Sequence, residues 1–345
     1  MDSHKKIDFE SIIGRDPKPA HFSSEEIVRF QGERFLVTGA GGSIGSRIVK
    51  LLSTIPNIEY LATDRDESSL HSLSLSLTSS ALFDSDRFKL LDIRDQAGVT
   101  ESFLRYRPTT IIHAAALKHL SVLQKQPREA ILTNVFGTAN VLEAAKICGA
   151  RNFINISTDK AAAPTSVLGM TKHLVELYTS EYRADGLHGY TNCRFGNVFN
   201  SRGSVIETFA KQMTLGAPIT LTDSAVTRFF MHVDEAAFLT LKSFLGNLGD
   251  VHIFEMGDPV LMFDIVKKMQ QVLSTSSQVI ITGLREGEKL HEQLIEVGVQ
   301  EIESDLADIR VLRFEDDYRD GFVEVLDFVR KRNLTGLSLF LEQMI

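Results

Sequence analysis

The stretch Val37-Thr38-Gly39-Ala40-Gly41-Gly42-Ser43-Ile44-Gly45-Ser46 decides the fold. It joins a short apolar run, Arg34–Val37, to an amphipathic stretch, Ser43–Ser53, so it lies between a predicted strand and a predicted helix. Three glycines form a G-x-x-G-x-x-G pattern, which permits a tight turn and close approach of the backbone to a pyrophosphate. An ordinary glycine-rich loop is the alternative, but this context favours a dinucleotide site. Its cofactor-facing residues would be Gly39, Gly41, Gly42, Ser43, Ile44 and Gly45.

The residues after the next two predicted strands bear on which dinucleotide binds. Asp64 is placed to accept hydrogen bonds from the adenosine ribose hydroxyls, which favours NAD. Arg65 is the residue type that tolerates a 2′-phosphate, so NADP stays open as the alternative. Asp92 and Ile93 could flank the adenine, although a solvated turn carboxylate is the other interpretation of Asp92.

Beyond the turn, strand-like runs alternate with helical stretches. The predicted strands are Arg34–Val37, Ile58–Thr63, Phe88–Ile93, Thr110–Ala115, Asn152–Ser157 and Tyr190–Phe195. The intervening predicted helices include Ser43–Ser53, Pro127–Cys148 and Thr165–Ala184. This rhythm is typical of βαβ units, so we expect an α/β fold with a doubly wound parallel Rossmann sheet.

After Asn197 the rhythm loosens, which predicts a smaller substrate-binding lobe. Short strands are expected at Ile219–Thr222, His252–Glu255 and Val279–Thr282, and helices near Ser204–Leu215, Val233–Leu245, Leu261–Leu273 and Glu288–Val297. We therefore divide the chain into an irregular N-terminal extension (1–30), a Rossmann domain (31–200, to which 229–260 returns) and a lobe made of 201–228 and 261–345.

Composition excludes several classes of protein. The 345 residues carry 37 Lys+Arg against 45 Asp+Glu, a net charge of -8, which argues against a nucleic-acid-binding surface. Two cysteines make no disulfide framework, and the ten histidines show no metal-ligand spacing, so we expect no metal site. No apolar run approaches the ~18 residues of a membrane span, and Met1–Ser11 lacks the apolar core of a signal peptide. We expect a cytoplasmic protein without a membrane span.

The chain resembles the extended short-chain dehydrogenases/reductases, and more narrowly the UDP-N-acetylglucosamine 4,6-dehydratase group of polysaccharide biosynthesis (CapD-like). The resemblance covers roughly residues 32–297. It is carried by TGAGGSIGS (38–46), HAAALKH (113–119), TNVFGTANV (133–141), STDKAAAPTSVLGMTK (157–172), RFGNVFNSRGSVI (194–206), VTRFFM (226–231) and GLREGEKLHE (283–292). IIGRDP (12–17) also looks like the linker that joins longer members to a membrane-spanning half.

In a doubly wound sheet, ligands bind at the carboxyl ends of the strands. Ala114, Ala115 and Ala116 end the fourth predicted strand, where small side chains admit a cofactor. Lys118 and His119 follow; a lysine here is ordinarily a solvated loop charge, but the resemblance implies that this pair lies near the substrate.

Ser157-Thr158-Asp159-Lys160 ends the fifth predicted strand. A hydroxyl, a carboxyl and an amine at a cleft suit a dehydration, whereas a polar turn with a surface ion pair is the structural alternative. The resemblance favours the catalytic interpretation. It implies that Thr158 holds the 4-oxygen, Asp159 is the acid and Lys160 is the base at carbon 5. Burial and neighbouring positive charges should lower the pKa of Lys160.

The stretch Leu168-Gly169-Met170-Thr171-Lys172 departs from the pattern of short-chain dehydrogenases. These enzymes place a Tyr four residues before a Lys, on one face of a helix. Lys172 matches and would orient the nicotinamide ribose, but the tyrosine position is Leu168. A leucine cannot transfer a proton, which argues against ketoreductases and epimerases that depend on that tyrosine.

The substrate side is expected to contain arginines, because a planar guanidinium binds diphosphate with bidentate, charge-assisted hydrogen bonds. Each arginine alone is more often a surface residue, but several lie in family-like motifs. The candidates are Asn197, Arg202, Arg228, Arg285 and Glu288, with Glu286 replacing a proline common in the resembled R-P-G-E-K motif.

The resemblance implies a redox-neutral dehydration that uses tightly held NAD(P). Hydride leaves carbon 4 of a UDP-linked hexosamine, water is lost across carbons 5 and 6, and the hydride returns to carbon 6. A nucleotide-sugar 4-epimerase, a dehydratase that stops at the 5,6-ene and a non-catalytic NAD(P)-binding regulator stay open as alternatives. We expect a homo-oligomer.

Overall fold

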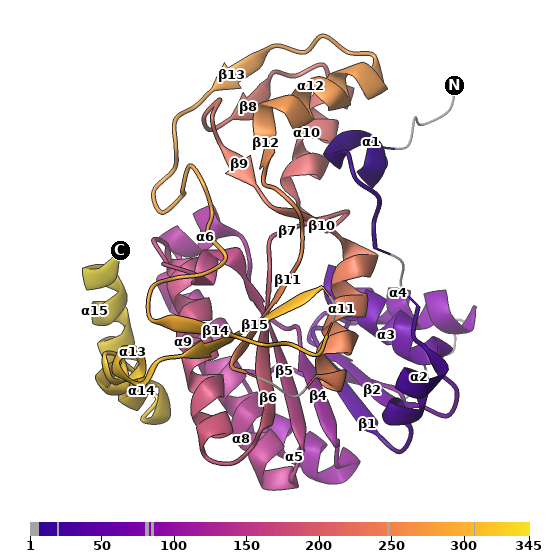
Figure 1. The fold of residues 1–345 in the computed structure, drawn as a ribbon, viewed down its shortest axis with the longest axis vertical. Coiled ribbons are helices and arrows are strands. Elements are labelled where there is room, and N and C mark those ends of the chain that lie inside the picture. The colour runs from indigo at the N-terminus through magenta and orange to yellow at the C-terminus, as the bar shows by residue number, and fades with distance from the viewer. Residues whose placement is uncertain (1–6, 19–20, 80–82, 84–85, 247–248, 307) are drawn as a thin grey trace.

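The computed structural model describes residues 7–18, 21–79, 83, 86–246, 249–306 and 308–345 (Figure 1). Residues 1–6 and 19–20 of the predicted N-terminal extension lie outside this description. Two lobes are visible: a large lobe around a twisted sheet, and a small lobe above the carboxyl ends of its strands (Figure 1).

Within the described residues, nine strands form the main sheet in the order β14-β15-β11-β6-β5-β4-β1-β2-β3. The strands are β3 (Phe88–Leu90), β2 (Glu59–Asp64), β1 (Arg34–Thr38), β4 (Thr110–His113), β5 (Asn152–Thr158), β6 (Gly189–Phe195), β11 (Val251–Phe254), β15 (Ile309–Phe314) and β14 (Val299–Ile302). From β3 to β11 every pairing is parallel, and the order reverses beside β1. The predicted doubly wound parallel sheet is therefore confirmed, and its switch point lies where ligands bind in such folds.

Helices cover both faces of this sheet because its central strands are buried on both sides. One face carries α5 (Gln96–Tyr106), α6 (Leu120–Lys125), α8 (Thr138–Cys148) and α9 (Val167–Ala184). The other face carries α2 (Ser24–Phe30), α3 (Ser43–Thr54), α4 (Glu67–Thr78) and α11 (Val233–Leu245). None of the described helices is long and apolar enough to cross a membrane.

The small lobe has its own apolar core. It consists of α1 (Phe9–Ile13), α10 (Val205–Thr214), α12 (Met262–Leu273), β8 (Ile219–Leu221), β9 (Thr227–Arg228), β12 (Val260–Leu261) and β13 (Val279–Ile281). The parallel pair β7 (Asn197–Phe199) and β10 (Phe230–His232) lies where the lobes meet (Figure 1).

The N-terminal segment is not the irregular extension that the sequence analysis expects. It forms α1, which packs in the small lobe, and α2, which packs on the main sheet. Between them, Arg15 makes a bidentate ion pair with the buried carboxylate of Glu235 at the start of α11, with an N–O distance of 2.9 Å. This segment therefore ties the two lobes together.

The predicted boundary of the small lobe is wrong at its C-terminal end. Residues 299–314 leave that lobe, and β15 pairs antiparallel with β11 while β14 extends the sheet edge. The chain then forms α13 (Asp316–Asp320), α14 (Val323–Arg330) and α15 (Leu334–Met344), whose apolar side chains join the core under α8 and α9.

The helix predicted near Glu288–Val297 does not form. Arg228 donates to the carbonyls of Lys289 and Leu290, and Arg194 donates to that of Leu294. These guanidinium groups occupy carbonyls that a helix would pair with its own N–H groups. The segment instead runs through turns to β14.

The predicted helix at Pro127–Cys148 forms, but not as one regular α-helix. It divides into α7 (Pro127–Ala130), a buried π-helical stretch η1 (Ile131–Gly137) and α8. Short π-helical segments are frequent at functional sites. Here η1 presents Asn134, whose amide bonds both the N–H and the carbonyl of Leu117, at 2.8 and 3.1 Å. That residue thereby fixes the loop after β4.

Candidate active site

The glycine turn has the geometry that a dinucleotide needs. Gly39 has a φ of +65°, and a Cβ there would lie 2.6 Å from the Ala115 nitrogen, so the turn packs directly on the loop after β4. A Cβ on Gly45 would lie 2.2 Å from the Gly39 carbonyl oxygen. Helix α3 then begins at Ser43 without a side-chain cap. Its first N–H groups are free to bind a pyrophosphate, so these residues fit a dinucleotide.

Asp64 lies at the end of β2, beside this turn. Its carboxylate accepts hydrogen bonds from the N–H groups of Gly41 and Asp66, both at 2.9 Å. These hydrogen bonds hold the carboxylate of Asp64 and the glycine turn together in one unit.

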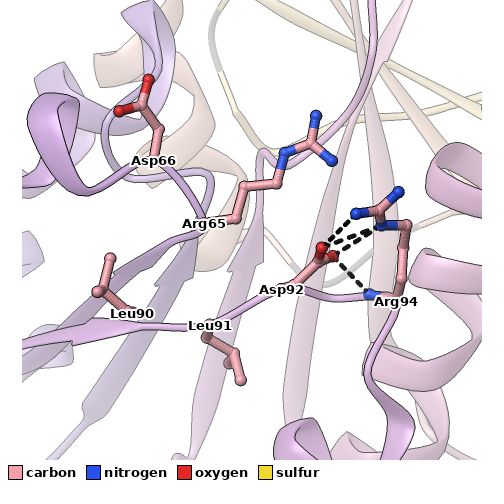
Figure 2. Close-up of a pocket in the computed structure, with 6 residues that line it drawn as sticks. All are labelled: Arg65, Asp66, Leu90, Leu91, Asp92 and Arg94. Atoms are coloured by element: carbon pink, nitrogen blue, oxygen red, sulfur yellow. Dashed lines mark hydrogen bonds and ion pairs between the residues drawn. The ribbon is translucent and has the colours of Figure 1, made fainter.

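An open pocket of about 560 Å³ adjoins Asp64 and is lined by Arg65, Asp66, Leu90, Leu91, Asp92 and Arg94 (Figure 2). Arg94 binds Asp92 through a fork of hydrogen bonds, which lowers the pKa of Asp92 (Figure 2). Arg65 projects across the pocket toward them. Ile93, predicted to flank the adenine, follows Asp92; its side chain is buried and its carbonyl accepts a hydrogen bond from Asn140.

The three residues Thr158, Asp159 and Lys160 lie together at the end of β5, where the strand passes into the short 3₁₀ helix η2 (Asp159–Ala161). Lys160 Nζ lies 2.9 Å from Asp159 Oδ1, and Thr158 Oγ1 donates to the same oxygen at 3.0 Å. The Asp159 carboxylate is fully buried, and the Lys160 side chain is 19% exposed. Asn197 Oδ1 approaches Lys160 Nζ at 3.4 Å.

The predicted fall in the pKa of Lys160 is wrong for the protein itself. Burial acts to lower this pKa, but the carboxylates of Asp159 and Glu292 outweigh burial, and the pKa is raised. The structure therefore holds Lys160 as an ammonium ion within a compact ion pair.

Lys172 is buried on α9 and faces β5, the strand that ends at Thr158. Its Nζ lies 3.5 Å from Asn155 Oδ1 on β5. Burial lowers the pKa of Lys172 to about 8, although Glu176 acts in the opposite direction. Leu168, at the position of the usual tyrosine, is 5% exposed and packs in the core.

Of the predicted substrate residues, Arg228 and Glu288 come together beside Lys160. Arg228 is buried, and its guanidinium lies 3.4 Å from Glu288 Oε1. Glu288 also accepts the main-chain N–H of Arg285, whose side chain is exposed. These contacts shape the loop that follows Gly283.

Glu292 is a site residue that the sequence analysis missed. Its buried carboxylate lies 3.6 Å from Lys160, 3.7 Å from Lys289 and 3.9 Å from Arg228. Among the described residues, Glu292 Oε2, Asp159 Oδ2 and Ser157 Oγ are buried without a hydrogen-bond partner. These polar atoms are oriented for contacts that the protein alone does not supply.

Arg202 does not join this group. It lies over the glycine turn, and Lys118 donates to its carbonyl oxygen at 2.6 Å. His119 packs against Gly203 in the same loop. The predicted substrate residues therefore divide into two sets, one at Lys160 and the other at the turn.

A buried group of His173, Glu176 and Glu296 has donor atoms within 4.8 Å of one another. Arg194 makes ion pairs with both glutamates, at 2.5 and 2.6 Å. The carboxylates are thus engaged with a fully buried guanidinium, and the group is a charge network that joins α9, β6 and the segment before β14.

Comparisons with known proteins give the family. Residues 35–313 match the family model described as "Polysaccharide biosynthesis protein". The chain belongs to this family. The resemblance to its CapD-like members is confirmed.

Two curated relatives of the chain carry different names. The chain is 36% identical over 300 residues to the probable polysaccharide biosynthesis protein EpsC of Bacillus subtilis (strain 168), covering 84% of this chain and 49% of that protein. The chain thus spans about half the length of that relative. It is also 31% identical over 330 residues to a UDP-glucose 4-epimerase of Rickettsia canadensis (strain McKiel), covering 90% of this chain and 94% of the relative.

Among solved structures, Pen from Bacillus thuringiensis matches the chain with a TM-score of 0.71 and 26% identity. The match covers 83% of this chain and 89% of that one. Most of the chain therefore shares its fold with this solved structure.

Proposed function

We propose that this protein is an NAD-dependent nucleotide-sugar 4,6-dehydratase that acts on a UDP-linked N-acetylhexosamine. The observation that carries the proposal is the contact between Lys160 and Asp159 at the carboxyl end of β5, next to a dinucleotide turn. The buried Leu168 supports it, because the tyrosine on which many relatives with this fold depend is replaced.

The Lys160–Asp159 pair supplies an acid and a base from one ion pair. Moving one proton across the 2.9 Å hydrogen bond converts an ammonium and a carboxylate into an amine and a carboxylic acid. The amine then removes the proton from carbon 5, and the acid donates a proton to the departing carbon 6 hydroxyl. After loss of water the pair is again an ammonium and a carboxylate. The ammonium then returns a proton to carbon 5 as the 4-keto-6-deoxy product forms, and the proton released from the 4-hydroxyl when it is oxidised restores the ion pair, so the protons balance.

Other residues hold the reactants. Thr158 hydrogen-bonds the sugar 4-oxygen, and Arg228 faces the substrate diphosphate, to which a guanidinium is suited. Lys172 orients the nicotinamide ribose. When bound, NAD supplies the reversible hydride transfer that a redox-neutral dehydration needs.

A 4-epimerase is the second candidate, favoured by the relative that carries that name. Substrate labelled with deuterium at carbon 4 separates the two activities. A dehydratase yields a product lighter by one water with deuterium on carbon 6, whereas an epimerase loses no water and returns deuterium to carbon 4. A dehydratase that stops at the 5,6-ene loses water without label on carbon 6. Unchanged substrate would favour a binding protein and overturn the proposal.

The two catalytic assignments are tested by Asp159→Asn and Lys160→Ala. Each variant should lose turnover by at least roughly a hundredfold while still binding NAD, since general acid–base groups contribute on this scale. Near-native activity in both variants would overturn the assignments. Cytoplasmic location and assembly as a homo-oligomer remain predictions.

A further inference from the structure

Residues 201–204, which we call the bridge, connect β7 to α10 and cross between two loops of the large lobe. The bridge has a defined conformation, because Gly203 has a φ of +66° and its N–H donates to Glu207 Oε2 at 2.6 Å. Ser201 Oγ donates to the Val198 carbonyl at 2.8 Å, which fixes the other end. The segment is thus built to hold one shape.

One side of the bridge is bound to the glycine turn through Arg202. The Arg202 main-chain N–H donates to Ser43 Oγ at 3.0 Å. Its guanidinium donates to Ser69 Oγ at 3.0 Å and to the Gly41 carbonyl. These hydrogen bonds go to neutral oxygen atoms, and the carboxylate of Asp66, which accepts from Ser69 Oγ, interacts with the guanidinium only electrostatically. A guanidinium placed in this way can still bind an anion through charge-assisted hydrogen bonds.

The other side of the bridge is bound to the loop after β4. Lys118 Nζ donates to the Arg202 carbonyl at 2.6 Å. Gly203 has no Cβ, which leaves room for the His119 ring. A Cβ at this position would lie 2.7 Å from the Cε1 atom of His119. The bridge therefore joins the loops that follow the adjacent strands β1 and β4.

We infer that the bridge closes over the dinucleotide and that Arg202 is the residue that retains the cofactor. The inference rests on the proposed cofactor, not on the proposed dehydration. A dinucleotide that binds at the glycine turn and extends along the carboxyl ends of the strands lies beneath residues 201–204. Its release requires the contacts of Arg202 with Gly41, Ser43 and Ser69 to break, and the guanidinium adds attraction for the pyrophosphate.

Release of NADH measures this directly. Protein loaded with NADH is mixed with excess NAD, and cofactor fluorescence is followed by stopped flow; the chain contains no Trp to interfere. Arg202→Ala should release NADH on the order of tenfold faster, because charge-assisted hydrogen bonds are lost. Arg202→Lys, which keeps the charge but not the fork, should fall between. Lys211→Ala removes an equal charge from the exposed side of α10 and should match the unchanged protein.

Each other outcome counts against the inference. Equal release from Arg202→Ala and the unchanged protein would overturn it, as would faster release from Lys211→Ala as well.

A second measurement, titration of UDP into NAD-loaded protein, tests the substrate-binding role that the sequence analysis predicts for Arg202. Weaker UDP binding with unchanged NADH release would assign Arg202 to the substrate and overturn the inference. Failure to bind NADH at all would remove the proposed cofactor together with the inference, whereas a protein that binds NADH but forms no dehydration product loses only the dehydratase proposal.

Discussion

The carboxylate of Glu292 lies 3.6 Å from the ammonium of Lys160. The sequence analysis assigns these two residues to different parts of the chain, Lys160 to the Rossmann domain and Glu292 to the small lobe. Asp159 approaches the same ammonium from its own strand end at 2.9 Å. Lys160 therefore lies between two buried carboxylates, one at the end of its own strand and the other on the segment that leads to β14. The protonation state of the proposed base depends on both.

Replacing Glu292 with Gln should shift the pH dependence of the reaction. Loss of a carboxylate near Lys160 lowers the pKa of this lysine, so the basic limb of kcat/KM, where the Lys160–Asp159 pair loses its one proton, should move to lower pH by roughly one unit. The pH profiles of the two proteins check this. Glu286→Gln, an exposed change nearby, is the control and should leave the limb in place. A Glu292→Gln profile identical to that of the unchanged protein would show that Glu292 does not influence the base.

The pKa of Lys172 is about 8 in the folded chain and 10.5 for an ordinary lysine. The protein should therefore become more stable as the pH rises from about 8 to 10.5. Between these values the unfolded chain binds more protons than the folded chain, so the free energy of unfolding increases with pH. Lys172→Met should abolish that increase and raise stability at pH 7 by roughly 3 kcal/mol. Urea unfolding at pH 7 and 9.5 measures both effects. If Lys172→Met is no more stable at pH 7 than the unchanged protein, this expectation is contradicted.

Loss of Arg194 should be among the most destabilising single changes in the chain. Arg194→Leu leaves Glu176 and Glu296 buried without their cation, which costs about 3–5 kcal/mol in such pairs. Arg310→Leu removes an arginine with a similar fork to Glu301 at the exposed sheet edge. This control should cost less than about 1 kcal/mol. Comparable urea midpoints for the two variants would mean that the buried network does not carry this stability.

Asp64 should set the preference for NAD over NADP. Its carboxylate repels a 2′-phosphate, so Asp64→Ala should narrow or invert the difference between the two dissociation constants. Titration of cofactor-free protein with each dinucleotide gives the ratio of the NAD and NADP dissociation constants. Adding Arg65→Ala to the Asp64→Ala variant should restore discrimination against NADP. A native preference for NADP would show that Arg65 dominates the pocket.

The Rossmann part of the fold was predictable because its signals are local. The glycine turn is continuous in sequence, and the first strands are apolar runs buried on both faces. Helix α2 carried a usable signal as well: Ser23 and Glu26 form a capping box, the S-x-x-E pattern that starts many helices.

The rest of the site depends on contacts between distant segments, which local patterns do not contain. Glu292 lies in a stretch with helical periodicity, and a charge there is ordinarily solvated. It is buried because Lys160, Arg228 and Lys289 surround it. Arg202 likewise lies in a family-like motif, but only the folded chain shows that it meets the glycine turn.

The position of β15 has a consequence for the synthesis of the chain. This strand covers the edge of β11 (Val251–Phe254), yet it is made of residues 309–314, which are synthesised more than fifty residues later. Until then β11 has an open edge, and an unpaired edge strand is a template for pairing with another chain. Glu296, the second partner of Arg194, is also synthesised about a hundred residues after that arginine. In a nascent or truncated chain that ends before residue 296, the edge of β11 is therefore unpaired. Arg194 in such a chain has only Glu176, and not Glu296, as its ion-pair partner from this network.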